Sequence, residues 1–136
     1  MKAYEDFTNK AIERIKADPE VLGLAAGGSW ISGQMDEFSD IDLVLITKNS
    51  VSDSLEKMKG YAEKIGPLLN AFTGEHVGEK RLLICLYDNP LLHVDIKFVT
   101  PDEFRHRVEN PVILWDKDGS ILKTLQDTFA SWPALD

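Results

Sequence analysis

The chain has 136 residues, of which 43% are hydrophobic, enough for one domain with a core of its own. Its formal net charge of -8 argues against a nucleic-acid backbone as the main partner, because phosphate contacts need clustered Lys and Arg. No run approaches the ~18 apolar residues of a membrane span, and the N-terminus is no signal peptide. The lone cysteine, Cys85, lies in an apolar run as a buried hydrophobe would, so we expect a cytoplasmic protein without membrane contact.

Apolar residues recur at two spacings along the chain, and each spacing predicts one kind of element. Recurrence every three or four residues, bounded by capping residues or proline, predicts helices. These are expected at 4–15, 50–65, 101–108 and 120–129. Alternation, or a short continuous apolar run, predicts strands. These are expected at 21–26, 41–47, 81–88, 91–99 and 112–115, with a further short strand at 68–72 in the least regular part of the chain.

Two acidic residues stand at the start of the strand expected at 41–47. Side chains on a strand alternate between its faces, so Asp40 and Asp42 share one face and Ile41 takes the other. Two like charges side by side are costly unless a cation lies between them. Oxygen ligands on a rigid strand suit Mg²⁺, which completes its shell with waters and substrate phosphates. The pair therefore predicts a divalent-metal site.

A glycine turn precedes this pair in the chain. The apolar run that ends at Ala26 is followed by Gly27, Gly28 and Ser29. Glycines let backbone amides approach an anion closely, and a helix that starts there would add its N-terminal amides. Trp30 comes next, where it either stacks on a base or packs at the start of the helix. A phosphate site next to a metal site implies a nucleotide.

A third acid, Asp95, lies in the middle of the apolar stretch LLHVDIKFV and therefore needs a partner. His93, Asp95 and Lys97 share one face of this expected strand. Either Lys97 pairs with Asp95, or Asp95 joins Asp40 and Asp42 at one cavity. Three carboxylates there could hold two metal ions, which would clamp the attacking and leaving oxygens of a displacement at phosphorus. His93 is then a candidate neighbour of the site.

Together these residues resemble the nucleotidyltransferase superfamily with the DNA polymerase β-like fold. Its signature is Gly-Ser, a spacer, Asp-x-Asp and a separate third carboxylate, which this chain matches with Gly28-Ser29, Asp40-Ile41-Asp42 and Asp95. The closer likeness, over roughly residues 20–122, is to the aminoglycoside (streptomycin-type) adenylyltransferases. The resemblance implies an α+β fold with a mixed β-sheet flanked by helices. It also implies transfer of a nucleoside monophosphate, AMP from ATP, to a hydroxyl of a small aminoglycoside-like acceptor, with release of pyrophosphate.

The resemblance assigns a role to each motif residue. Gly28 and Ser29 would hold the β- and γ-phosphates of the nucleotide. Asp40 and Asp42 would bridge two Mg²⁺ ions, or Mn²⁺ in their place, and Asp95 would complete the catalytic metal site and help to activate the acceptor hydroxyl. The family also places Lys or Arg near the phosphates. The candidates here, whose alternative is ordinary surface charge, are Lys97, Arg81 and Lys80.

One departure concerns the acceptor. Relatives of the adenylyltransferase type continue into a helical domain that helps to bind it, whereas this sequence ends at Asp136, soon after the last expected helix. We therefore expect a single nucleotidyltransferase domain, residues 1–136, without the C-terminal helical acceptor domain. The chain is then either shortened or completed by a partner subunit, which includes a second copy in a homodimer.

Other functions compete with this interpretation. The stretch VILWDKDGSIL is similar to the first motif of the haloacid dehalogenase phosphatases, with Asp116 as nucleophile and Asp118 as acid. Too little chain follows for the rest of that site, so a strand-turn-helix junction is the simpler explanation. A metal-dependent glycosyltransferase would need a longer domain. The serious alternative is a non-catalytic module of the same fold, antitoxin-like or dependent on a partner, whose cleft another chain would cover.

Overall fold

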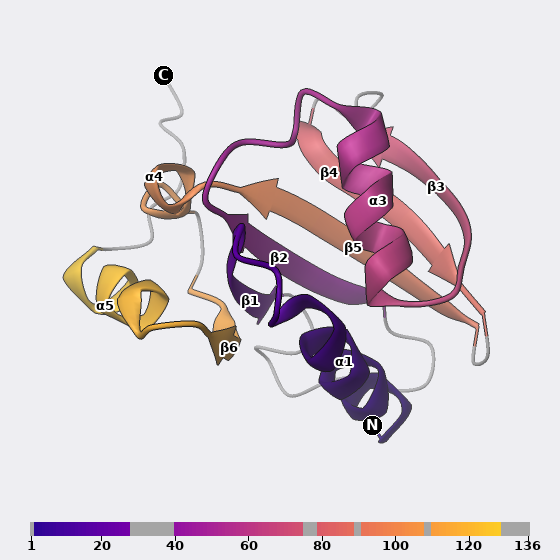
Figure 1. Cartoon of the computed structure of the whole chain (residues 1–136), viewed down its shortest axis with the longest axis horizontal. Helices are drawn as coiled ribbons and strands as arrows, with labels where there is room; N and C mark the ends of the chain where they lie inside the picture. The colour runs from indigo at the N-terminus through magenta and orange to yellow at the C-terminus, as the bar shows by residue number, and fades with distance from the viewer. Residues whose placement is uncertain (1, 28–39, 75–78, 89–90, 108–109, 129–136) are drawn as a thin grey trace.

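The computed structural model describes residues 2–27, 40–74, 79–88, 91–107 and 110–128. They form one six-stranded sheet with helices packed against it (Figure 1). The strands are β1 (Val21–Gly27), β2 (Ile41–Thr47), β3 (Leu68–Gly74), β4 (Glu79–Tyr87), β5 (Leu92–Val99) and β6 (Val112–Asp116). The helices are α1 (Lys2–Ile15), α3 (Leu55–Ile65), α4 (Pro101–Phe104) and α5 (Ser120–Asp127). None of these helices is both long and apolar enough to cross a membrane.

The strands lie in the order β3-β4-β5-β2-β1-β6. The pairing of β2 with β5 is parallel, and the other pairings between the described strands are antiparallel. The sheet is therefore mixed, and the α+β fold that the resemblance implies is confirmed. The continuous apolar run of β2 suits its position between two neighbours, because a strand inside a sheet is buried along its length.

Helices α1 and α3 cover one face of the sheet, and the main core lies between them and the strands (Figure 1). Every second residue of β5 enters this core. These are the residues that the sequence analysis assigned to one side: Leu92, Val94, Ile96 and Phe98. Cys85 of β4 is buried in the same core, where burial raises the pKa of its thiol to about 12. Cys85 is therefore a small core side chain rather than a nucleophile, as the sequence predicts.

Helices α4 and α5 pack on the opposite face. A smaller apolar cluster there joins Ile46 at the end of β2 and Val99 at the end of β5 to Phe104 of α4 and Ile121 of α5. On the same face, Val99 is preceded on β5 by Lys97 and Asp95, and Ile46 is preceded on β2 by Val44 and Asp42. The beginnings of both strands are therefore where a polar site can form.

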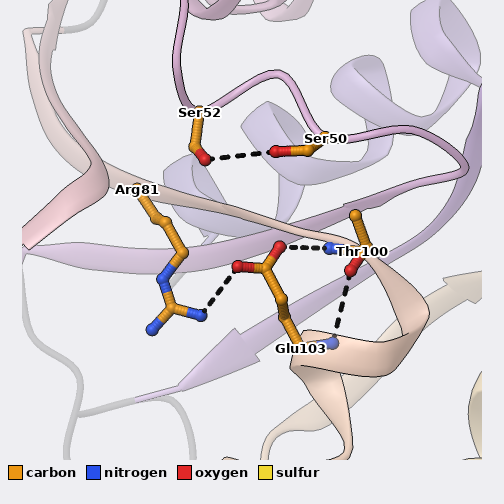
Figure 2. Close-up of polar contacts among 5 residues, drawn as sticks. All are labelled: Ser50, Ser52, Arg81, Thr100 and Glu103. Carbon is orange, nitrogen blue, oxygen red and sulfur yellow. Dashed lines mark hydrogen bonds and ion pairs between the residues drawn. The ribbon is translucent and has the colours of Figure 1, made fainter.

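The expected start of the second helix is wrong by five residues. Ser54, not Ser50, is the N-cap of α3, and its side chain accepts a hydrogen bond of 3.2 Å from the backbone N–H of Lys57. Ser50 instead lies 3.3 Å, hydroxyl to hydroxyl, from Ser52 in the preceding turn (Figure 2). Val51 is buried in that turn, which is why its apolar side chain fitted the helical pattern. The residue that begins the helix, Leu55, is 46% exposed.

At the junction between β6 and α5, the side chain of Asp116 has a structural role. Asp116 Oδ1 accepts a hydrogen bond from the backbone N–H of Gly119 at 3.0 Å, and Oδ2 accepts one from Leu122 at 2.8 Å. The first amides of a helix lack partners within the helix, and a carboxylate placed there satisfies them. The backbone of Gly119 adopts φ 83°, a conformation that suits glycine. Asp116 therefore acts as a cap of α5, which agrees with the strand-turn-helix explanation of this motif.

A buried tyrosine joins the sheet to both helices of the main core. The Tyr87 side chain, at the end of β4, is fully buried. Its hydroxyl donates a 2.7 Å hydrogen bond to the backbone carbonyl of Ala62 in α3. Its ring lies 4.9 Å, centroid to centroid, from that of Phe7 in α1.

Tyr87→Phe should lower the free energy of unfolding by about 1 kcal/mol, because it removes one buried hydrogen bond and keeps the ring packing. Urea-induced unfolding followed by circular dichroism measures the change. Tyr61→Phe is the matched control, since its ring packs near Phe98 and its hydroxyl makes no hydrogen bond to any residue that the structure describes. Equal losses in the two variants would contradict the role of the Tyr87 hydroxyl.

Candidate functional site

The two central strands bring acids from distant parts of the chain together. In the parallel pairing of β2 with β5, Asp42 lies opposite Asp95 at the same register position. Paired positions on neighbouring strands project to the same face. That face is opposite the main core, because the next residues along, Leu43 and Ile96, are buried in the core beneath α1 and α3. The structure therefore has on one face two of the three acids that the sequence analysis assigned to one cavity, Asp42 and Asp95.

His93 links the remaining acid to this pair. Asp40 comes directly before β2, and its Oδ1 lies 3.2 Å from Nδ1 of His93. The other ring nitrogen, Nε2, lies 3.2 Å from Oδ1 of Asp95. His93 shares the face of Asp95 because it precedes it by two positions on β5. One imidazole thus contacts two of the three expected metal ligands.

Asp95 is the more enclosed of these two acids, with 25% of its side chain exposed against 52% for Asp40. Its Oδ1 is buried and has no hydrogen bond within the described part of the chain, since His93 meets it at ion-pair distance without hydrogen-bond alignment. Burial raises the pKa of Asp95 above its ordinary value; His93 lowers this pKa and Asp40 raises it. Burying a carboxylate oxygen without a hydrogen-bond donor costs free energy, and a bound cation or a proton would offset that cost.

The chemistry of these side chains fits a divalent ion. Mg²⁺ and Mn²⁺ prefer carboxylate oxygens, and Oδ1 of Asp95 is an oxygen without a hydrogen-bond donor. The positions of these side chains in the structure, however, do not yet form a metal site. Among the residues described, no group of three or more His, Cys, Asp or Glu side chains is positioned to hold an ion. Asp40, Asp42 and Asp95 would therefore have to draw closer together around a bound ion.

A small cavity of about 120 Å³ lies beside the acids on the same face. Gly27 lines it and pairs with Asp42 across β1 and β2. Lys97, two positions after Asp95, lines it as well. Its other walls come from β2, β4, α4 and the residues after α4, and they include Val44, Arg81, Glu103, Phe104, His106 and Arg107. Cationic side chains from separate elements therefore border one cavity, an arrangement that suits an anionic group.

An ion pair fixes one wall of this cavity (Figure 2). Arg81 Nη1 on β4 lies 3.3 Å from Oε2 of Glu103 on α4. Oε1 of Glu103 also accepts a hydrogen bond from the backbone N–H of Thr100 at 3.0 Å, and the Thr100 hydroxyl accepts one from the Glu103 N–H at 3.3 Å. This reciprocal pair is a capping box. Arg81 is therefore part of the cavity wall, held by the residue that caps α4.

The remaining expected site residues are distributed unevenly. Gly28, Ser29 and Trp30 lie outside the described residues, so their roles stay predictions. Lys80 belongs to the first residues of β4. The sequence analysis missed the residues after β5 that line the cavity: Glu103, Phe104, His106 and Arg107. The Thr-Pro-Asp-Glu pattern of the capping box was a readable signal for Glu103, but the place of the others depends on how α4 packs.

Comparison with known proteins identifies a protein family that this chain matches. The family model described as a nucleotidyltransferase domain matches residues 8–117. A nucleotidyltransferase-like protein from Exiguobacterium sibiricum is 14% identical with a TM-score of 0.47, over 91% of this chain and 38% of that one. Spectinomycin adenyltransferase AAD(9) from Enterococcus faecialis, solved with ATP and spectinomycin, is 13% identical with a TM-score of 0.46, over 93% and 46%. The match spans less than half of either solved chain. Curated proteins show no match.

The raised pKa of Asp95 predicts how stability depends on pH when a chelator removes divalent ions. The folded state holds the Asp95 proton more tightly than the unfolded state, whose pKa is near 3.8, so folding stability falls as pH rises from 3.8 through the folded-state pKa. Asp95→Asn removes this loss and should be more stable than the wild type at neutral pH, with the advantage disappearing below pH 3.8.

Urea unfolding in EDTA across a pH series measures this dependence. Asp53→Asn, an exposed acid in the turn before α3, is the control and should give a curve parallel to that of the wild type. A wild type that is more stable than Asp95→Asn at neutral pH would show that burial does not oppose ionisation of Asp95.

Proposed function

Because the chain belongs to the nucleotidyltransferase domain family, we propose that it is a metal-dependent nucleotidyltransferase. It transfers a nucleoside monophosphate, AMP from ATP, to a hydroxyl of a small acceptor such as an aminoglycoside-like molecule, and it releases pyrophosphate. The observation that supports this most is the in-register pairing of Asp42 with Asp95, with Asp40 joined to Asp95 through His93. Acids that far apart in the chain gather on one face of the sheet at an energetic cost, and binding a divalent ion would offset that cost.

In the proposed reaction, the acceptor oxygen forms a bond to the α-phosphorus as the bond from that phosphorus to the pyrophosphate oxygen breaks. Asp40, Asp42 and Asp95 would hold the divalent ions, which neutralise charge on the attacking and leaving oxygens. The hydroxyl proton would leave toward Asp95, because burial makes that carboxylate more basic than an exposed one. The acids thus both bind the ions and help to activate the acceptor.

The cavity beside the acids suits the phosphates of the nucleotide. Lys97 and Arg81 line it, and its edge at Gly27 is next to the expected phosphate turn of Gly28 and Ser29. Cations in this position would stabilise the charge that develops on the leaving pyrophosphate. Val44 and Phe104 contribute apolar surface, which limits water near the transferred group.

The alternative is a non-catalytic module of the same fold that binds a nucleotide or a protein. Exposed apolar residues on the edge strand β3 favour it: Leu69 is 55% exposed and Phe72 is 50% exposed. Edge strands without charged residues tend to pair with other chains. Such a module would bind ATP without releasing pyrophosphate, and a partner chain or second copy would cover part of its surface.

Asp42→Asn should weaken ATP binding in the presence of Mg²⁺ by roughly tenfold or more, because it removes a charged ion ligand. Calorimetry at saturating Mg²⁺, repeated in EDTA, measures the difference. Asp53→Asn makes the same charge change on an exposed turn and should leave the affinity unchanged. Equal ATP affinity in the wild type and Asp42→Asn would contradict the assignment of Asp42 as a metal ligand.

Turnover distinguishes the enzyme from the module. Pyrophosphate release is measured for each nucleoside triphosphate with a panel of hydroxyl-bearing small molecules that includes aminoglycosides. The proposed enzyme requires both a nucleotide and an acceptor, and Asp42→Asn abolishes the release. Metal-dependent ATP binding without release for any acceptor points to the module instead.

Lys97→Met should weaken binding of ATP by roughly tenfold while AMP affinity changes little, because the lost cation contacts phosphates that AMP does not carry. Competition with a fluorescent nucleotide gives both affinities. Lys48→Met, an exposed lysine just after β2, is the matched control. Parallel losses for ATP and AMP would place Lys97 away from the β- and γ-phosphates.

A further inference from the structure

An imidazole lies between two of the carboxylates that the proposed site assigns to a metal ion. His93 meets Asp40 through Nδ1 and Asp95 through Nε2, each at 3.2 Å. The two nitrogens are separated by one ring carbon and face different directions, so a single ring contacts both carboxylates at once. The His93 side chain is 45% exposed. It can therefore turn toward solvent without leaving a cavity in the core.

A bridging imidazole and a shared ion exclude each other. Mg²⁺ holds oxygen ligands at about 2.0–2.1 Å, so two oxygens on one ion lie no more than about 4.2 Å apart. A ring that contacts an oxygen of each carboxylate competes with such an ion for the same two oxygens. Within the described ranges, no three potential ligands are positioned to hold an ion, which agrees with carboxylates that are engaged by the ring instead.

We propose that the side chain of His93 occupies the metal site when no ion is bound. In the ion-free protein its ring links Asp40 to Asp95 across the sheet face, and it turns away when a divalent ion binds between them. The inference rests on the proposed function, which assigns these acids to the ion. In this role His93 is a positioning residue, because it prepares the ligands without contacting the nucleotide or the acceptor.

This role makes a definite prediction about affinity. Contacts between partly exposed polar side chains contribute little individually, so displacing the ring costs the wild type a few-fold to about tenfold in ion affinity. Removing the ring also leaves the empty site with facing carboxylates and nothing between them, which favours ion binding further. A histidine that ligated the ion would have the opposite effect, because its loss would weaken binding.

Mn²⁺ binding without nucleotide tests the proposal at one fixed pH, with free Mn²⁺ followed by electron paramagnetic resonance. His93→Ala should bind Mn²⁺ roughly threefold to tenfold more tightly than the wild type, since no ring must be displaced. His93→Gln keeps a polar side chain of similar reach and should fall between the two. Unchanged or weaker Mn²⁺ binding in both variants overturns the proposal.

Stability measurements separate this role from a merely structural one. In EDTA, His93→Ala should unfold at lower urea concentration than the wild type, because the link between the acids is lost. In saturating Mn²⁺ the deficit should disappear, because the ring makes no contact with the acids in the ion-bound wild type. An equal deficit under both conditions contradicts the proposal and makes the contact a fixed part of the fold.

Two controls complete the design. Asp53→Asn removes an exposed acid from the turn before α3 and should leave Mn²⁺ affinity unchanged. Asp42→Asn shows whether a negative result contradicts the metal site itself or only the role of His93. If it binds Mn²⁺ like the wild type, the metal assignment and the proposed function fail together. If it loses Mn²⁺ binding while both His93 variants match the wild type, only the role of His93 is wrong.

Discussion

The parallel pairing of β2 with β5 is the contact on which the site depends. Its register sets Asp42 opposite Asp95, and a slip of one residue would turn either acid into the main core. The apolar residues that follow the acids prevent that slip, because Leu43 and Ile96 are fully buried beneath α1 and α3. Packing on one face of the sheet thus determines the geometry of the carboxylates on the other.

The two faces of the sheet have different tasks. The α1 and α3 face supplies the apolar core, with Tyr87 joined to both helices. The opposite face is covered by α4 and α5 near the ends of the central strands and carries the acids near their beginnings. The ion pair of Arg81 with Glu103 holds α4 at the cavity through its capping box. A short helix of low intrinsic stability is therefore anchored by a side chain from a distant strand.

The electrostatics of the acidic face are consistent with a binding site rather than a surface built for stability. Asp95 is buried enough to raise its pKa, and its Oδ1 has no hydrogen bond in the described part of the chain. A structural acid would have been satisfied locally, as Asp116 is by the first amides of α5. The contrast between these two carboxylates supports the proposal that Asp95 belongs to a binding site, whereas Asp116 completes the cap of a helix.

The sequence by itself determined what depends on local periodicity. Strand alternation is enough to place His93, Asp95 and Lys97 on one face, to put Asp40 and Asp42 together, and to identify the fold through their motif. It misplaced the start of α3, because Ser50 and Ser54 are both competent caps and tertiary packing chose between them. Only the tertiary structure decided the register of β2 on β5, the contacts of His93 with Asp40 and Asp95, and the pairing of Arg81 with Glu103. Each of these is a contact between residues far apart in the chain, and its energy depends on how whole elements pack rather than on the residues nearby.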